Sequence, residues 1–293
     1  MKRKTWFWAL TPVAVALSLY GCGNGSDSDL AVDNNAQSCS VVSGTGSAVV
    51  VGSGLPGDPA APEAASGYRL GYKAKQSSNY MVVANTPLAT KAGCDVLKAG
   101  GTAVDAAVAV QAVLGLVEPQ SSTIAGSAFM MYYDAANKKV VAYDGRETAP
   151  AAATGYYLAR QDQGNASSTA PVPSARRSGR SIGVPGVMRM LDMAHKEHGK
   201  LAWAPLFDEG IRLASSGYKI PGRMGDAIRT NAANLQLDAN AVAAYFNADG
   251  TPKTTGTVTT NLPYAQSLRT LATGGADAMY SGPLAEAIVA KAA

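Results

Sequence analysis

The stretch LKAGGTAVDAAVAVQAVLGLVEPQSST, residues 97–123, decides the fold of this chain. Thr102 stands before an apolar run that extends from Ala106 to about Val117, and Asp105 follows Thr102 at the spacing of a helix capping box. A carboxylate in the first turn accepts free amide protons and suits the positive end of the helix dipole. Because the run is apolar nearly all round, we predict a helix that is buried on most sides.

This helix is too short to cross a membrane. A transmembrane helix needs about 20 consecutive apolar residues, whereas this run begins next to an acid and is stopped by Pro119. The whole chain has 293 residues, of which 47% are hydrophobic, and a net charge of only +4. The length and the hydrophobic fraction fit one large domain or two small ones. The chain has no long block of like charges, so nothing in its charge pattern indicates a nucleic-acid partner.

The first 22 residues have the layout of a secretory signal, with Lys2, Arg3 and Lys4 before an apolar run. Residues 19–22, Leu-Tyr-Gly-Cys, resemble the lipobox of bacterial lipoproteins, in which the cysteine is acylated. We therefore expect a lipid anchor on Cys22 and a periplasmic or outer-membrane-anchored protein. The alternative is an ordinary signal that is cleaved nearby.

Residues 23–67 are rich in Gly, Ser, Pro, Asp and Ala and lack apolar periodicity, which predicts a flexible tether. Cys39 lies in this tether and Cys94 in a predicted helix. Disulfides persist in exported proteins, so the two could pair; two unpaired thiols are the alternative.

The folded region begins near residue 68. YMVVA (80–84) predicts a short buried strand, and Thr86 with Pro87 predicts a helix start that Gly100 and Gly101 close. Two strand-like runs on either side of AANK (135–138) predict a hairpin. Further helices are predicted at 186–199, 203–217, 227–238, 264–275 and 282–293.

Residues 88–122, together with YDGRETAPAAAT (143–154), resemble the γ-glutamyltransferase family, and the likeness extends over residues 68–293. The resemblance implies an N-terminal nucleophile hydrolase, an α/β fold in which an αββα sandwich places helices outside two packed sheets. This chain would supply part of the large-subunit region. The implied substrate is glutathione or another γ-glutamyl compound, the implied partner is a small subunit from the same precursor, and no metal or organic cofactor is implied.

The sequence departs from the family pattern at two places. Ala125, Ser127 and Ala128 stand where the family usually has a dense glycine run, and Thr102 replaces the usual Asn. The family's nucleophile is a Thr followed by Thr-His. The pairs Thr254-Thr255 and Thr259-Thr260 are followed by Gly and Asn instead. We therefore expect the nucleophile beyond Ala293, in a chain that is truncated and inactive alone.

Arg146 is the main candidate site residue, because the resemblance implies that it holds the α-carboxylate of the γ-glutamyl group. A guanidinium presents a planar fork that can bind a carboxylate through two parallel hydrogen bonds. Without the resemblance, an arginine after a strand would be read as a surface charge or an ion pair with Glu147.

Other polar residues are interpreted structurally. Asp105 is expected to cap a helix and Glu118 to stand at a helix end. His195 and His198 have no third ligand at a suitable spacing, so we expect an exposed helix end rather than a metal site. Arg176, Arg177 and Arg180 are expected in a solvated loop.

Two other functions remain open. A glycine-poor turn is compatible with an acylase of the same fold that acts on a glutaryl or cephalosporin-type side chain. A non-catalytic surface lipoprotein from a truncated gene is the second alternative.

Overall fold

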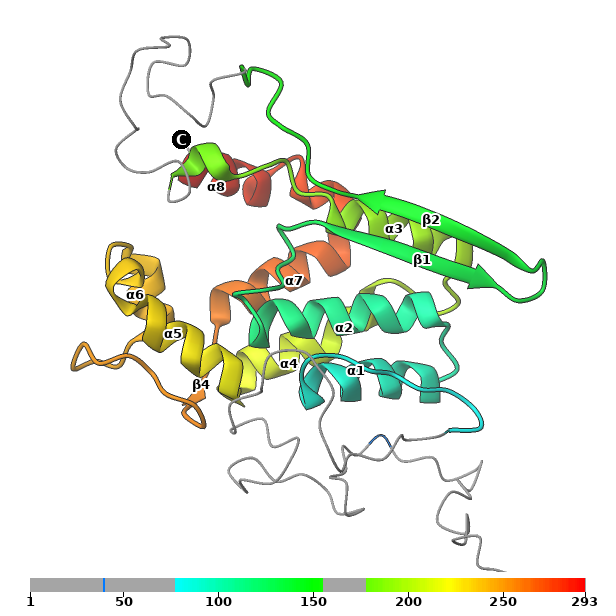
Figure 1. The fold of residues 1–293 in the computed structure, drawn as a ribbon, viewed down its shortest axis with the longest axis horizontal. Helices are drawn as coiled ribbons and strands as arrows, with labels where there is room; N and C mark the ends of the chain where they lie inside the picture. The colour runs from blue at the N-terminus through cyan, green and yellow to red at the C-terminus, as the bar shows by residue number, and fades with distance from the viewer. Residues whose placement is uncertain (1–38, 40–76, 155–177, 293) are drawn as a thin grey trace, which may run out of the picture.

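The structure is a computed structural model that describes residues 39, 77–154 and 178–292 (Figure 1). The predicted signal (1–22), the predicted tether (23–67) except Cys39, and Arg176 with Arg177 lie outside the described residues.

A helical hairpin of α1 (Pro87–Lys98) and α2 (Ala103–Val117) confirms the predicted helix starts. The Thr86 hydroxyl accepts a hydrogen bond from the Ala89 amide. In α2, the Thr102 hydroxyl accepts from the Asp105 amide, and the Asp105 carboxylate accepts from the Thr102 amide at 2.7 Å. The capping box therefore forms, and it satisfies backbone donors that the first turn leaves unpaired.

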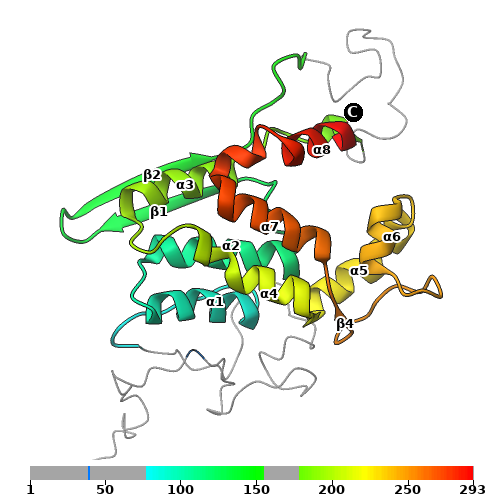
Figure 2. The ribbon, with the colours of Figure 1, turned by 180° about the vertical axis from the view of Figure 1, so that it is seen from behind.

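Helix α2 lies at the centre of the molecule and is buried on two sides (Figures 1 and 2). Val104, Val108 and Ala112 belong to a core shared with the β-hairpin and helices α3 and α7. Ala109, Val113 and Leu116 belong to a second core with α1, α4 and α5. This double burial explains why the sequence of α2 is apolar nearly all round.

The predicted β-hairpin consists of β1 (Ala128–Asp134) and β2 (Lys139–Gly145), which pair antiparallel from Ala128 opposite Gly145 to Asp134 opposite Lys139. One face packs on α3 (Val187–His198) and the other faces solvent. The large apolar side chains of the outer face are exposed: Phe129 by 67%, Met131 by 70%, Tyr133 by 61% and Val140 by 55%.

Most of the remaining predicted helices are confirmed. The elements in chain order are η3 (Gly179–Ser181), α3, η4 (Ala204–Phe207), α4 (Asp208–Ser216), β3 (Tyr218–Lys219), α5 (Gly222–Leu235), α6 (Ala239–Tyr245), β4 (Val258–Thr259), α7 (Leu262–Gly274), η5 (Gly275–Met279) and α8 (Pro283–Ala292). Helix α5 begins five residues before the predicted 227, and α6 is an element that the sequence did not predict. Strands β3 and β4 form a separate antiparallel pair.

The prediction of a buried strand at residues 80–84 is wrong. These residues adopt no strand, and Met81 and Val83 are 50% and 86% exposed. A β-branched run becomes a strand only where a neighbouring strand takes its backbone hydrogen bonds. Here the Ala84 amide donates instead to the hydroxyl of Thr90, on α1.

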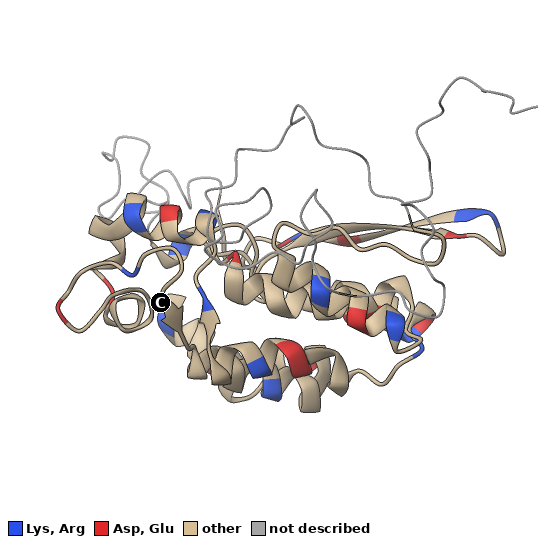
Figure 3. Ribbon diagram, turned by 90° about the horizontal axis from the view of Figure 1, so that it is seen from below, with Lys and Arg blue, Asp and Glu red and all other residues tan. Residues whose placement is uncertain are grey.

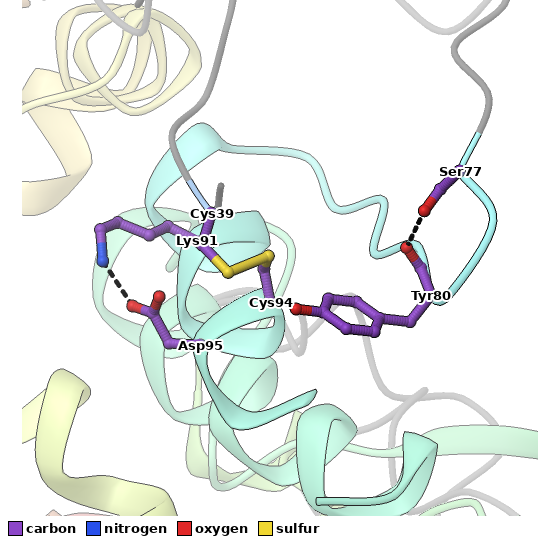
Figure 4. The surroundings of a disulfide bond; sticks show 6 residues. All are labelled: Cys39, Ser77, Tyr80, Lys91, Cys94 and Asp95. Carbon is purple, nitrogen blue, oxygen red and sulfur yellow. Dashed lines mark hydrogen bonds and ion pairs between the residues drawn. A yellow bond between two sulfur atoms is a disulfide. The ribbon is translucent and has the colours of Figure 1, made fainter. Parts of the chain in front are cut away.

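A disulfide joins Cys39 to Cys94 on α1, which answers the question that the sequence left open (Figure 4). The ring of Tyr80 points toward Cys94, and the Ser77 hydroxyl donates to the Tyr80 carbonyl at 2.7 Å. The bond closes a loop with a sequence separation of 55 residues, so it constrains the unfolded chain.

Charged residues are spread over the helices and the hairpin rather than gathered in one block (Figure 3). Among the helices that the structure describes, none combines the length and the apolar character that a membrane crossing requires.

Candidate functional site

Arg146 follows the last residue of β2, and its side chain is 59% exposed. One terminal nitrogen (NH2) of its guanidinium lies 3.0 Å from Glu147 Oε1, and the other (NH1) donates to Ser127 Oγ at 3.2 Å. The Arg146 amide donates to Asp144 Oδ1 at 2.9 Å. The side chain is therefore oriented by its neighbours although it is accessible to solvent.

The register of the hairpin explains why the Ser127 and Arg146 side chains are in contact. Ala128 pairs with Gly145, so the next positions outward on the two chains are Ser127 and Arg146. Cross-strand neighbours have Cβ atoms about 4.5–5.5 Å apart, within reach of a hydroxyl and a guanidinium. The local sequence thus brings together Arg146, its neighbour Glu147 and Ser127.

The segment before α3 supports this end of the hairpin through close backbone contact. The amides of Gly186 and Val187 donate to the Gly126 carbonyl at 3.0 and 3.1 Å. A Cβ atom on Gly186 would overlap the Gly145 carbonyl, and one on Gly183 would lie 2.7 Å from Glu147 Cβ. Only glycine allows these approaches, so the segment 183–186 (Gly-Val-Pro-Gly) fixes the backbone that carries the site.

Glu147 keeps its negative charge beside Arg146. A hydrogen bond from the Ser127 side chain is the largest cause of the lowered pKa of the Glu147 carboxyl, and the positive charge of Arg146 also contributes. Glu147 Oε2 is shielded from solvent and has no hydrogen-bond partner among the described residues. A cation and an anion therefore lie side by side, which complements the carboxylate and ammonium of an amino-acid headgroup.

Asp105, in the first turn of α2, and Glu118, the C-cap residue after α2, have structural roles, as predicted. Asp105 is fully buried and, besides capping α2, accepts hydrogen bonds from the amides of Lys200 and Leu201 at 3.0 and 3.3 Å. Glu118 is 1% exposed and lies 3.3 Å from the guanidinium of Arg223.

The prediction that His195 and His198 form an exposed helix end is wrong, because their side chains are only 14% and 18% exposed. His195 Nε2 lies 2.9 Å from the Leu201 carbonyl oxygen, and the His198 ring stacks on Tyr132 at 4.0 Å between centroids. The last turn of α3 is covered by the hairpin and by the segment that follows the helix. No cluster of metal-binding side chains occurs among the described residues.

The threonine pairs lie away from the candidate site. Strand β4, which contains Thr259, lies beside α4 and α5, across α2 and α7 from the hairpin (Figures 1 and 2). Thr259 is buried and its hydroxyl accepts a hydrogen bond from Lys253 at 2.9 Å. Arg180 lies in η3 and is half-buried.

Comparison with known proteins gives a consistent result. A family profile described as "Gamma-glutamyltranspeptidase" matches residues 89–293. Glutathione hydrolase 3 of Arabidopsis thaliana is 36% identical over 214 residues, which cover 73% of this chain and 32% of that protein. The glutathione hydrolase proenzyme of Bacillus subtilis (strain 168) is 34% identical over 210 residues, covering 71% of this chain and 34% of the proenzyme. The chain thus spans about a third of the length of these relatives.

Solved structures show the same relationship. The γ-glutamyltranspeptidase of Helicobacter pylori superimposes with a TM-score of 0.68 and 28% identity over 74% of this chain and 60% of that one. A cephalosporin acylase from Bacillus halodurans superimposes with a TM-score of 0.60 and 26% identity, covering 74% of this chain and 42% of the acylase. These relatives have the fold of N-terminal nucleophile hydrolases, of which the chain covers part.

Proposed function

Because the chain belongs to the γ-glutamyltranspeptidase family, we propose that it carries the headgroup-binding part of an enzyme that transfers or hydrolyses γ-glutamyl groups. The proposed substrates are glutathione and related γ-glutamyl amides. A small subunit from the same precursor completes the enzyme and brings the nucleophilic Thr, since the two pairs Thr254-Thr255 and Thr259-Thr260 lack the following His.

The observation that carries this proposal is the oriented, exposed guanidinium of Arg146 beside the Glu147 carboxylate. The guanidinium binds the α-carboxylate of the substrate through paired hydrogen bonds, and the partly exposed Glu147 carboxylate accepts a hydrogen bond from the α-ammonium. A headgroup held in this way places the distant γ-carbonyl at the nucleophile.

The proposed reaction proceeds through a covalent γ-glutamyl-enzyme. The Thr hydroxyl oxygen attacks the γ-carbonyl carbon while the α-amine of the same Thr takes the hydroxyl proton. The carbon–nitrogen bond then breaks, and the leaving amine receives that proton. Water or the amine of an amino acid attacks the resulting ester, which releases glutamate or a new γ-glutamyl compound and restores the hydroxyl.

Substitution of Arg146 by Lys in the complete enzyme tests the proposal, because an ammonium cannot replace the planar fork. We expect kcat/KM for γ-glutamyl-p-nitroanilide to fall about 10- to 100-fold, the effect of losing a charged hydrogen bond. Arg212→Lys is a matched control, because Arg212 is 57% exposed and pairs with Glu209 on α4. Equal kinetics for Arg146→Lys, Arg212→Lys and the wild type would refute the proposal.

An acylase is a second candidate, and the likeness to the cephalosporin acylase favours it. A glutaryl group lacks the α-ammonium of a γ-glutamyl group. The Glu147 carboxylate beside Arg146 therefore favours the γ-glutamyl substrate. Turnover of glutaryl-p-nitroanilide above that of γ-glutamyl-p-nitroanilide by the complete enzyme would reverse this order. If the complete protein binds glutamate and turns over neither compound, the non-catalytic lipoprotein is supported.

We also propose that the protein is exported and anchored through lipid on Cys22. Support comes from the basic start of the chain, the apolar run and the lipobox-like residues 19–22. Labelling of cells with a radioactive fatty acid should mark the wild type and not Cys22→Ser, and only the wild type should remain in the membrane fraction. Equal labelling of both proteins would refute the anchor.

A further inference from the structure

The hydroxyl of Ser127 contacts the guanidinium of Arg146, which itself pairs with Glu147. It accepts a hydrogen bond from Arg146 NH1 at 3.2 Å, and Arg146 NH2 lies 3.0 Å from Glu147 Oε1. A hydroxyl can hold a guanidinium in this way, because it has two acceptor positions. Ser127 therefore fixes one side of the guanidinium whose other side pairs with Glu147, and both charged residues are proposed to bind the substrate headgroup.

Backbone pairing and backbone hydrogen bonds fix the position of Ser127. Its position opposite Arg146 follows from the register of β1 and β2, and the preceding carbonyl, that of Gly126, accepts two amide hydrogen bonds from Gly186 and Val187. Ser127 is half-buried, whereas the Arg146 side chain is mostly exposed. A long exposed side chain loses rotamer entropy when it is held in one geometry, so a fixed acceptor that holds it in advance lowers the cost of binding.

We propose that Ser127 is a positioning residue, which holds the Arg146 guanidinium, and through it the paired Glu147 carboxylate, in the arrangement that receives the substrate headgroup. This inference rests on the proposed function of Arg146. The glycine run that the family usually has at this turn offers no side chain for this role. Ser127 therefore gives this chain a more rigid headgroup site than a glycine would.

Steady-state kinetics of the complete enzyme test the role with γ-glutamyl-p-nitroanilide as substrate. Ser127→Ala and Ser127→Gly should raise KM about threefold to tenfold with little change in kcat, because a hydrogen bond to a charged group is lost before the chemical step. Ser127→Thr retains a hydroxyl and should restore much of the wild-type KM. Ser121→Ala is a matched control in the same connection between α2 and β1, because Ser121 also accepts from an arginine, Arg223, at 3.4 Å.

The kinetic results distinguish a positioning role of Ser127 from other roles. A raised KM for Ser127→Ala and Ser127→Gly, with Ser121→Ala like the wild type, supports the positioning role. Wild-type KM values for both Ser127 variants would overturn it. A fall in kcat alone would also overturn it, because that result places Ser127 in the chemical step or in general folding.

A second measurement needs no enzymatic activity. In the full 293-residue chain, NMR of the arginine side chains reports how fast the Arg146 guanidinium rotates about its Nε–Cζ bond. We expect faster rotation in Ser127→Ala and an unchanged rate in Ser121→Ala. An unchanged rate in Ser127→Ala would refute the positioning role. Faster rotation together with a complete enzyme that lacks γ-glutamyl turnover would support the positioning role and refute the proposed function.

Discussion

The two faces of the β1–β2 hairpin have similar sequences and different surroundings. The inner face, with Tyr132, Val141 and Tyr143, packs on α3, and Tyr143 is 7% exposed. The outer face, with Met131 and Tyr133, is exposed by 70% and 61% at these residues. Strands that are apolar on both sides are typical of sheets covered on both faces. The described chain covers one face of such a sheet.

The family's fold supplies a reason for the difference. An αββα sandwich packs two sheets face to face, with their inner side chains interdigitating. The chain covers part of that fold and contributes the hairpin with its helical layer. We therefore predict that the outer face becomes buried in the complete enzyme, whereas the inner face is buried already.

The largest expected difference in the free energy of unfolding is between alanine variants of two tyrosines, one on each face of the hairpin. Tyr143→Ala on the inner face should lower the free energy of unfolding of the full chain by about 3–5 kcal/mol, because it leaves a cavity and removes a packed ring. Tyr133→Ala on the outer face should change it by less than about 0.5 kcal/mol. Urea denaturation measures both values, and equal losses would contradict the assignment of the two faces.

A smaller effect is expected from Met131→Ser, which makes the outer face more polar. In the full chain we expect almost no change in the free energy of unfolding, because Met131 is 70% exposed. In the complete enzyme the loss should be about 1.5–3 kcal/mol, the usual contribution of a buried methionine. Denaturation of both proteins is the measurement, and an equally small change in the two would mean that the outer face stays exposed.

The local structure could largely be predicted from the sequence, because short-range contacts determine it. The caps at Thr86 and Thr102 and the turn between β1 and β2 are of this kind. The failures concern long-range contacts. The segment 80–84 has strand-forming residues without a partner strand, and the partners of the two histidines depend on how the hairpin lies over α3.

The candidate site was predicted in part. Arg146 was identified through the resemblance, whereas Ser127 was noted only as a departure from a glycine run. A signal for its role was present in the sequence. A hairpin turn at 135–138 with paired flanking residues places 127 opposite 146, and a hydroxyl opposite a guanidinium forms a hydrogen bond. The pairing of Arg146 with Glu147 depends on the conformation after β2, which no local pattern specifies.

The last expected effect is a pH dependence of the free energy of unfolding that comes from Tyr143, on the inner face of the hairpin. Burial, followed by the 2.6 Å hydrogen bond from its hydroxyl to Glu197, raises the pKa of Tyr143 from 10.0 to about 12. The folded chain thus retains a proton that the unfolded chain loses, so this contribution to stability is complete below pH 10 and is lost as pH rises through 12.

Tyr143→Phe isolates this contribution. Burial also raises the pKa of Tyr218 and Tyr264, so the wild type loses stability at high pH for more than one reason. The Phe variant should lose less stability than the wild type between pH 10 and pH 12. Urea denaturation at a series of pH values measures the difference. Parallel pH profiles for the two proteins would show that Tyr143 does not titrate in this way.

The most direct test of the central claim is a crystal structure of the complete enzyme with glutamate bound. We predict that the glutamate α-carboxylate lies on the Arg146 guanidinium, at the end of the hairpin where Arg146 contacts both Ser127 and Glu147. A structure in which Arg146 points away from the bound glutamate would contradict the claim.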